Sequence, residues 1–321
     1  MLLEKVRKSR LLGRSGSRFP VANKWDSLAS KTGEKYLICN GAEGEPGVFK
    51  DKYILKNEPE KVVLGIEKTM EALGMDRCFF YLRKDYKKTL GLKLKSLIED
   101  KDIEIVEKKD RYVAGEETAA VNAIEGLRPE PSIKPPFPTE SGIGGRPTLV
   151  HNVETMYAVA EIAEDEYNYE RFYCIFGKVK NGGVFKLKNN LSLEEVLKKT
   201  DNYPDFNFLV QVGGGAGGVF LTSKELSAEC KRLGAIEVFR ADKFDPLKKM
   251  KSISRFLMHG NCDKCTPCRE GIYRINKMLK KGDYNKEILE DITFALSGSS
   301  YCPLGKVAAE VFKSLDKIHE N

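Results

Sequence analysis

Four of the eight cysteines place the strongest constraint on how this 321-residue chain can fold. Cys262, Cys265 and Cys268 form a C-x-x-C-x-x-C motif, and Cys302 follows in SSYCPLG. Three thiolates this close in sequence can cover one face of a cluster while a fourth closes it from a distant loop, as in a [4Fe–4S] site. Tetrahedral zinc and disulfides are the alternatives. Because zinc sites usually pair two C-x-x-C knuckles, the spacing favours iron–sulfur.

The residues beside these cysteines agree with that interpretation. Pro267 precedes Cys268 and Pro303 follows Cys302, so both loops are stiffened at a ligand. A helix that we expect to begin near Arg269 would direct its positive N-terminal dipole at an anionic cluster.

The other four cysteines have no such spacing. Cys39, Cys78 and Cys174 lie in the apolar runs YLICN, RCFFYL and FYCIFG, where a small buried side chain is expected. Cys230 lies in a polar, helix-like stretch, and no role follows for it. The three histidines make a His-rich metal site hard to build.

Length and composition exclude several classes of protein. The length predicts two or three domains. No run approaches the roughly 20 apolar residues of a membrane-spanning helix, and the start lacks the apolar core of a secretory signal. The net charge of +7 is too diffuse to indicate nucleic-acid binding. We therefore expect a cytoplasmic protein, or one peripheral to a membrane complex, with no direct membrane insertion.

The first half of the chain alternates strand and helix patterns. Strands are expected at 36–40, 77–82 and 103–108, with helices at 62–73 and 86–100 between them and another at 152–164. This alternation predicts a parallel sheet of the nucleotide-binding kind, although no G-x-G-x-x-G follows the first strand. The Pro- and Gly-rich segment 128–148 is either a linker or a rigid site-forming loop. The N-terminal KVRKSR run is expected to be a solvated arm.

The second half divides into a small mixed unit and a helical tail. Strand patterns around FYCIFGKV, GGVFKL, FNFLVQVGG and AIEVFR surround the short helix LSLEEVLKK, and GGGAGGVF (213–220) is expected to be a structural turn. Beyond Pro246 we expect helices at 246–258, 269–281, 285–296 and 304–318. The predicted domains are 1–168, 169–245 and 246–321.

Seven blocks, in order over nearly the whole chain, carry a family resemblance. The chain resembles the flavin-bearing, NADH-binding subunit of respiratory complex I and its relatives in soluble NAD-reducing hydrogenases and formate dehydrogenases. The blocks are GRSGSRFPVANKW (13–25), CNGAEGEPGVFKDKYIL (39–55), YVAGEETAAVNAIEG (112–126), KPPFP (134–138), GGRPTLVHNVET (144–155), GNCDKCTPCREG (260–271) and SSYCPLGKVAAE (299–310).

The resemblance implies a fold, a reaction and partners. The implied α/β fold has a Rossmann-like flavin domain, a ubiquitin-like β-grasp domain and a C-terminal helical bundle that holds a [4Fe–4S] cluster. The implied reaction passes a hydride from NAD(H) or NADP(H) to FMN and then single electrons to the cluster, because iron–sulfur centres accept one electron at a time. The implied partners are a thioredoxin-like [2Fe–2S] subunit and further iron–sulfur or catalytic subunits.

The resemblance also implies roles for single residues. Flavin contacts are implied for one set: Gly13, Gly16, Lys24, Asn40, Tyr112, Gly115, Glu116, Glu117, Val150, Asn152 and Thr155. For the dinucleotide, Phe19 and Phe137 would sandwich the adenine and Lys134 would lie by the pyrophosphate. Glu45 and Glu117 would contact the reacting nicotinamide or its ribose, which makes them the catalytic candidates. A solvated turn for the acidic loop, and a surface role for Lys24, are the interpretations without the resemblance.

A few positions depart from the family pattern. Ser15, Ser17 and Arg18 stand where the family has glycine or alanine, Ala42 replaces a flavin-binding aspartate, and His151 replaces an asparagine. Arg18 either changes the backbone or fills part of the nucleotide pocket, and one alternative is that it selects NADPH by pairing with its additional phosphate. The other alternative is a non-catalytic iron–sulfur relay or assembly protein with lost or altered flavin or nucleotide binding.

Overall fold

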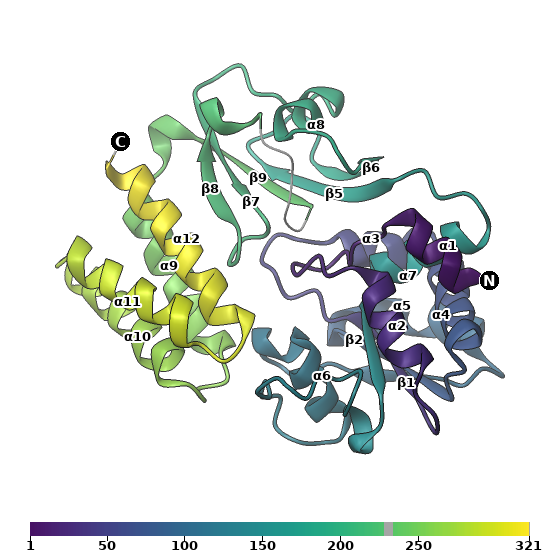
Figure 1. Ribbon diagram of the computed structural model, residues 1–321. Helices are drawn as coiled ribbons and strands as arrows, with labels where there is room; N and C mark the ends of the chain where they lie inside the picture. Colours follow the sequence, from purple (N-terminus) through teal and green to yellow (C-terminus); the bar gives the residue numbers. More distant parts are fainter. Residues whose placement is uncertain (228–233, 321) are drawn as a thin grey trace.

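The first half of the chain is built on a four-stranded parallel sheet that has helices on both faces (Figure 1). The computed structural model describes residues 1–227 and 234–320. The strands are β1 (Tyr36–Gly41), β2 (Arg77–Leu82), β3 (Ile103–Glu107) and β4 (Thr148–Asn152), in the order β3-β2-β1-β4. The three predicted strands are confirmed. β4 was not predicted, because it lies in the short stretch between the Pro- and Gly-rich segment 128–148 and the predicted helix 152–164, which is α7 (Val153–Ala163).

Alternate residues of the central strand point to opposite faces of the sheet. Leu37 and Cys39 face the larger core, together with α2 (Val21–Ala29), α4 (Pro59–Leu73) and α7. Ile38 faces the smaller core under α6 (Glu117–Ile124). α4 and α7 approach so closely that a Cβ on Gly65 would overlap the backbone of Met156.

The N-terminal segment is not the solvated arm that its charge predicted. It forms α1 (Leu2–Ser9), whose Val6 is completely buried in the larger core. The lysines and arginines of this helix lie on its other faces, so a short amphipathic pattern was misread as a charged tail. Two further helices, α3 (Lys50–Asn57) and α5 (Lys84–Ile98), complete the first part.

A second, mixed sheet of five strands follows and has the order β6-β5-β9-β7-β8. Its strands are β5 (Glu170–Gly177), β6 (Gly183–Lys188), β7 (Phe208–Val212), β8 (Val219–Thr222) and β9 (Ala235–Arg240), with α8 (Leu193–Lys199) packed against it. β5 and β9 are parallel neighbours at the centre and the other pairs are antiparallel, which is the β-grasp arrangement. β8 was missed because it follows directly on the glycine-rich turn.

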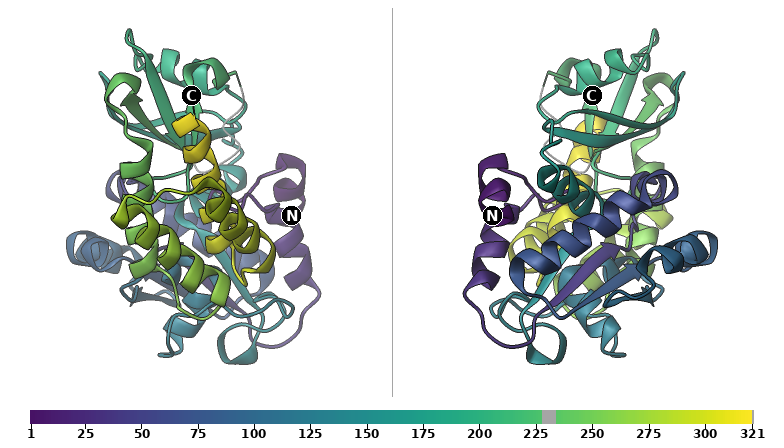
Figure 2. Two further views of the ribbon diagram at one scale, coloured as in Figure 1. Left: turned by 90° about the vertical axis from the view of Figure 1, so that its left-hand side faces the viewer. Right: turned by 90° about the vertical axis from the view of Figure 1, so that its right-hand side faces the viewer.

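Four helices form the C-terminal part (Figure 2). They are α9 (Pro246–Gly260), α10 (Thr266–Lys281), α11 (Lys286–Ser299) and α12 (Pro303–Glu320), as predicted within a few residues. α10 begins at Thr266 rather than near Arg269, so Cys268 lies inside its first turn. α12 also packs against β8, which joins the bundle to the second sheet. The boundaries of the three domains remain predictions.

The predicted core cysteines are confirmed as far as the structure reaches. Cys39, Cys78 and Cys174 are free thiols and completely buried. Cys230 lies outside the described residues. Among the described residues, no helix is both long enough and apolar enough to cross a bilayer.

Candidate functional site

The sheet order places a crevice at one defined point. The chain builds β2 and β3 on one side of β1 and then returns to add β4 on the other side. In parallel sheets, ligands bind outside the carboxyl ends of the strands where the order reverses in this way. Asn152 ends β4, Asn40 is the last residue but one of β1, and the two are partners in the sheet register. The two asparagines therefore mark the expected binding crevice.

Both asparagine amides are held by protein groups. Asn40 Nδ2 donates to Gly115 O at 2.9 Å, and its Oδ1 accepts from Ala42 N at 3.0 Å. Asn152 Nδ2 donates to Asp51 Oδ2 at 2.6 Å and Asn40 O at 3.2 Å, while its Oδ1 accepts from Lys50 Nζ and Glu154 N. These amides shape the crevice, and their side chains are already engaged.

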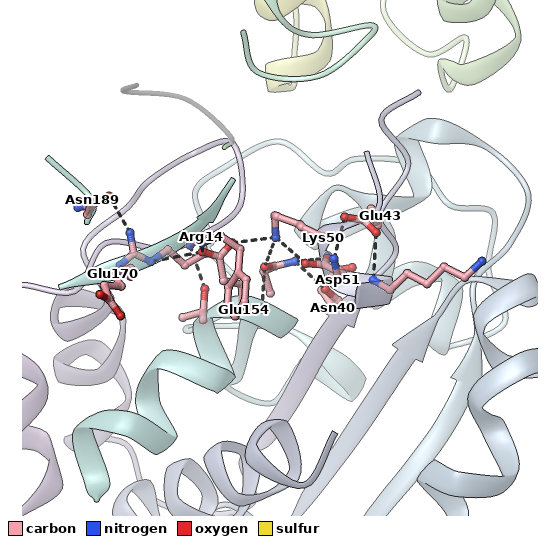
Figure 3. A network of polar contacts seen from close by, with 12 residues as sticks. Arg14, Asn40, Glu43, Lys50, Asp51, Glu154, Glu170 and Asn189 are labelled. Carbon is pink, nitrogen blue, oxygen red and sulfur yellow. Dashed lines mark hydrogen bonds and ion pairs between the residues drawn. The ribbon is translucent and has the colours of Figure 1, made fainter. Parts of the chain in front are cut away.

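A buried ionic network contacts Asn152 through Lys50 and Asp51, and Figure 3 shows it beside Asn40. Lys50, Asp51 and Glu154 are each no more than 1% exposed, and Lys50 Nζ contacts both carboxylates. Although burial opposes its charge, Asp51 and Glu154 raise the pKa of Lys50. Burial likewise opposes ionisation of Glu154, but Lys50 and Arg14 lower its pKa. The Lys50–Glu154 pair therefore remains charged inside the protein, whereas burial raises the pKa of Asp51 despite its contact with Lys50.

Arg14 extends this network into the second sheet. Its backbone N–H donates to Thr155 Oγ1 at 3.0 Å, and its guanidinium donates to Asn189 Oδ1, Tyr167 Oη and Glu170 O at 2.9–3.0 Å. Arg14 is 3% exposed. Arg14 thus connects the predicted flavin loop to α7 through its backbone and to β5 through its side chain.

A second cluster of charges combines two lysines with two glutamates. Lys134 Nζ lies 2.8 Å from Glu116 Oε1 and 2.6 Å from Glu117 Oε1, and Lys24 Nζ lies 2.7 Å from Glu117 Oε2. Burial disfavours the charge on Glu117, but the two lysines lower its pKa to about 2. Glu116 also caps α6 by accepting from Thr118 N and Ala119 N. Segment 128–148 therefore contributes Lys134 to the site, in agreement with a site-forming loop.

Glu45 points away from this cluster and into the glycine-rich turn of the second sheet. Its Oε2 accepts from Ala216 N at 2.9 Å and Gly217 N at 3.2 Å, and its Oε1 accepts from Tyr112 Oη. A Cβ at Gly214 or Gly217 would lie within 2.7 Å of this carboxylate, so only glycine leaves room for it. The glycine-rich turn 213–220, which was predicted to be structural, thus holds the acidic loop 41–47 in place through hydrogen bonds to Glu45.

Backbone contacts join the two ends of the predicted flavin loop. Gly13 N donates to Phe19 O at 2.9 Å, and Leu12 and Pro20 form an antiparallel bridge. Space around Gly16 is open, with no heavy atom within 4 Å of a Cβ placed there. Phe19 is 47% exposed and Phe137 is 49% exposed, as suits rings that stack on a base.

Two residues that depart from the family pattern, His151 and Ala42, are packed inside the protein. His151 is buried, and its Nε2 accepts from Trp25 Nε1 at 3.1 Å. Burial, with Lys24 nearby, lowers the pKa of His151 to about 3, so the ring is neutral. Ala42 is 4% exposed and packs against Gly115 without a side-chain hydrogen bond to offer.

The four motif cysteines come together where two helices begin. Cys265 is the N-cap residue of α10, Cys268 lies in its first turn, and Cys302 directly precedes α12. All four thiols are buried, and burial raises the pKa of Cys302 to about 11, with further contributions from its thiol neighbours. No three His, Cys, Asp or Glu side chains of the described residues converge tightly enough for a single metal ion. Four soft thiol donors beside two helix N-termini fit a larger anionic cluster.

A short segment joins the crevice to the cysteines. Residues 112–117 carry Gly115, Glu116 and Glu117 at the crevice, and Tyr112 at its start packs on Phe256 of α9 with ring centroids 5.3 Å apart. Arg111 Nη1 donates to Asn261 O at 3.0 Å, next to the first cysteine. A cavity of about 390 Å³ lies alongside, lined by residues that include Glu43, Tyr112 and His259.

Most of the residues named from the sequence meet in this region. Hydrogen bonds and ion pairs connect Asn40 with Asn152 and Gly115, Lys24 with Glu117 and Val150, and Glu117 with Lys134. Glu45 is joined to Tyr112 on the side of the glycine turn instead. Sequence reasoning missed Arg14, Lys50, Asp51 and Glu154, although Glu154 is one of only two charged residues in a largely apolar helix.

A switch-point crevice with cationic and aromatic sides, joined to a four-thiol site, defines a class. It is the class of redox proteins that carry a nucleotide-type cofactor and an iron–sulfur cluster on one chain. Comparison with known families supports both halves. Residues 6–161 match the Nuo51 FMN-binding domain, and residues 248–319 match the NADH-ubiquinone oxidoreductase-F iron–sulfur binding region.

Individual relatives agree over the full length of the chain. The F subunit of the NADH-quinone oxidoreductase of Aquifex aeolicus is 31% identical over 99% of this chain and 84% of its own length. The NADP-reducing hydrogenase subunit HndC of Solidesulfovibrio fructosivorans is 31% identical over 95% and 71%. A crystal structure of an NAD⁺-reducing [NiFe]-hydrogenase superposes with a TM-score of 0.93 at 30% identity, and this chain spans 61% of that solved chain.

The chain belongs to the family of F subunits of NADH-quinone oxidoreductase. It is part of an oxidoreductase, and its cofactors are FMN and a [4Fe–4S] cluster. The expected three-part fold is confirmed, and zinc and disulfides are set aside for the four motif cysteines.

Proposed function

We propose that this chain oxidises a reduced nicotinamide dinucleotide at the β1/β4 crevice and delivers the electrons singly to the cysteine site. FMN, when bound, accepts a hydride from the nicotinamide and gives up its electrons one at a time. Cys262, Cys265, Cys268 and Cys302 hold the cluster. The observation that carries this proposal is segment 112–117, which borders the crevice at one end and packs on α9, beside the cluster loop, at the other.

The protein groups bind, orient and shield. The backbone around Gly13 and Gly16 approaches the cofactor phosphate, and Lys24 supplies charge for it. Because Lys24 is paired with Glu117, phosphate binding must redirect the lysine. The floor of the proposed flavin site consists of Asn40, Gly115, Val150, Asn152 and Thr155.

We assign the dinucleotide to the other side of the crevice. Phe19 and Phe137 are the exposed rings for the adenine, and Lys134 is the cation for the pyrophosphate. Glu117, which stays ionised, is left to hydrogen-bond a ribose or the carboxamide. Glu45 holds the acidic loop and Tyr112 in place through the glycine turn, so its contribution is to position the loop.

The electrons must leave the cluster for another protein. The relatives are named as subunits of quinone-reducing or hydrogenase enzymes. We infer that this chain binds a thioredoxin-like [2Fe–2S] subunit and further iron–sulfur or catalytic subunits, which receive the electrons. We also infer that it lies on the cytoplasmic side, peripheral to any membrane part of the complex.

The experiment is anaerobic reduction of the purified protein, followed by flavin absorbance and electron paramagnetic resonance. With NADH or NADPH we expect bleaching of the flavin and a signal from a reduced [4Fe–4S] cluster. Cys265→Ser should lose the cluster signal and keep flavin reduction, whereas Cys174→Ser, a buried thiol outside the motif, should keep both. A brown protein without flavin that neither nucleotide reduces would overturn the proposal in favour of the iron–sulfur relay.

A further inference from the structure

Arg18 adopts a backbone conformation that suits glycine. Its φ of +49° lies in the left-handed region, where a side chain longer than that of glycine is strained. The sequence left open whether the arginine changes the backbone at this position. The structure shows that the left-handed turn is present and that an arginine occupies it. Strained backbone conformations of this kind cluster at ligand-binding and active sites, so the strain at Arg18 suggests a function for its side chain.

The loop combines Arg18 with two exposed serines. Arg14 is turned inward and buried, while Ser15 and Ser17 are exposed and their hydroxyl oxygens lie 3.4 Å apart. Arg18 is half-buried and directly precedes Phe19, one of the two exposed rings assigned to the adenine. The segment Ser15-Gly16-Ser17-Arg18 therefore borders the adenosine end of the proposed dinucleotide site.

The chemistry of this segment suits a phosphate monoester. An arginine fork and serine hydroxyls are donors that bind phosphate oxygens with charge-assisted hydrogen bonds. No Asp or Glu occurs between Glu4 and Asp26, so the loop itself carries no repelling carboxylate. In NAD-specific sites a carboxylate typically binds the adenosine 2′-hydroxyl. The loop offers no such carboxylate, since its sequence from Lys5 to Trp25 contains neither Asp nor Glu.

We propose that Arg18, with the hydroxyls of Ser15 and Ser17, binds the 2′-phosphate of a dinucleotide, so that this chain uses NADPH in preference to NADH. The assignment rests on the proposed function, because it names the substrate of the same site. Arg18 is a specificity-determining residue in it and takes no part in hydride transfer.

The first test compares steady-state kinetics of flavin reduction with the two nucleotides. In Arg18→Gly we expect kcat/KM for NADPH to fall about 10–100-fold, the loss of one charged hydrogen-bonded contact, with NADH changed by less than about twofold. Arg18→Lys should recover part of the loss, since lysine supplies charge without the fork. Arg10→Gly is the matched control, because Arg10 is exposed and also left-handed, with φ +51°, but lies outside the loop.

The second test measures binding without turnover. Calorimetry with 2′,5′-ADP and with 5′-ADP should show tighter binding of the former to the intact chain, and Arg18→Gly should remove the difference while Arg10→Gly keeps it. Equal affinity for the two probes overturns the assignment. Loss of FMN from Arg18→Gly also overturns it, because the Arg18 side chain would then serve the flavin phosphate, to which only the backbone of the loop is assigned. If neither nucleotide reduces the flavin, the proposed function fails, and the calorimetry still decides the role of Arg18.

Discussion

Lys50 Nζ lies 3.0 Å from Glu154 Oε2, and both residues are almost completely buried behind the crevice. Lys50 begins α3 after the acidic loop, and Glu154 lies in the first turn of α7 after β4. The same ammonium group reaches Asn152 Oδ1 at 3.1 Å, and Glu154 Oε1 accepts from Phe172 N in the second sheet. This single pair therefore joins the acidic loop, the end of β4 and the second sheet.

Lys50→Met should destabilise the fold strongly. Removing one partner leaves Asp51 and Glu154 as buried charges without their cation, which typically costs about 3–5 kcal/mol of the free energy of unfolding. Urea unfolding followed by circular dichroism measures the change. Lys198→Met is the matched control, because Lys198 pairs with Glu194 on an exposed helix face, and it should unfold as the parent does. Equal midpoints for the two variants would mean that the buried pair does not stabilise the protein.

Gly217→Ala tests whether the hydrogen bonds from the glycine turn to Glu45 hold the acidic loop in place. A Cβ there would stand 2.7 Å from Glu45 Oε1 and 3.0 Å from Val307, so the acidic loop or α12 must shift. We expect a loss of about 1–3 kcal/mol and weaker FMN retention after gel filtration, because the acidic loop follows Asn40. Gly298→Ala in α11 meets no atom within 4 Å and should stabilise by up to about 1 kcal/mol. A Gly217→Ala protein that keeps its stability and its FMN would contradict this role.

The sequence predicted the parts whose signals are local. Strands β1, β2 and β3 follow from apolar runs, the tail helices from their periodicity, and the cluster ligands from the spacing of Cys262, Cys265, Cys268 and Cys302. α1 was missed because eight residues with four charges offer little periodicity, and β8 because glycines precede it.

Contacts between residues far apart in the chain could not be predicted in the same way. Glu45 is 171 residues from Ala216, whose N–H binds it, and no local pattern couples an acidic loop to a glycine turn. Lys50 and Glu154 resemble ordinary surface charges in the sequence, and only the fold shows that they share one buried site. The role that the family resemblance implies for Glu45 at the nicotinamide or its ribose stays a prediction, while the hydrogen bonds of its carboxylate to the glycine turn follow only from the fold.

His151 should make stability depend on pH below about 6.5. Its pKa is lowered to about 3 in the folded chain, against about 6.5 when unfolded. The unfolded chain therefore binds a proton that the folded chain does not, so stability is complete above about pH 6.5 and falls as the pH decreases toward 3. The slope from this group is at most about 1.4 kcal/mol per pH unit.

Unfolding curves of His151→Asn and the parent, recorded from pH 7 to pH 4, isolate this contribution. The parent should lose more stability over that range than the variant does. His319→Asn, at an exposed position near the end of α12, should follow the parent curve. An imidazole that titrates near pH 6.5 in the folded protein by NMR would refute the assignment.

Arg128 should raise the reduction potential of the cluster. Its Nη2 donates to Cys262 O at 2.9 Å, so a positive charge stands beside the first ligand and favours the more negative, reduced cluster. Arg128→Gln should lower the potential by roughly 10–40 mV, a Coulomb effect reduced by the exposure of the side chain. Arg240→Gln is the matched control, since both arginines form 3.0 Å ion pairs with an acid two residues away, Glu130 and Asp242 respectively. A redox titration followed by electron paramagnetic resonance should show a shift for Arg128→Gln alone, and equal potentials in the two variants would rule out this role.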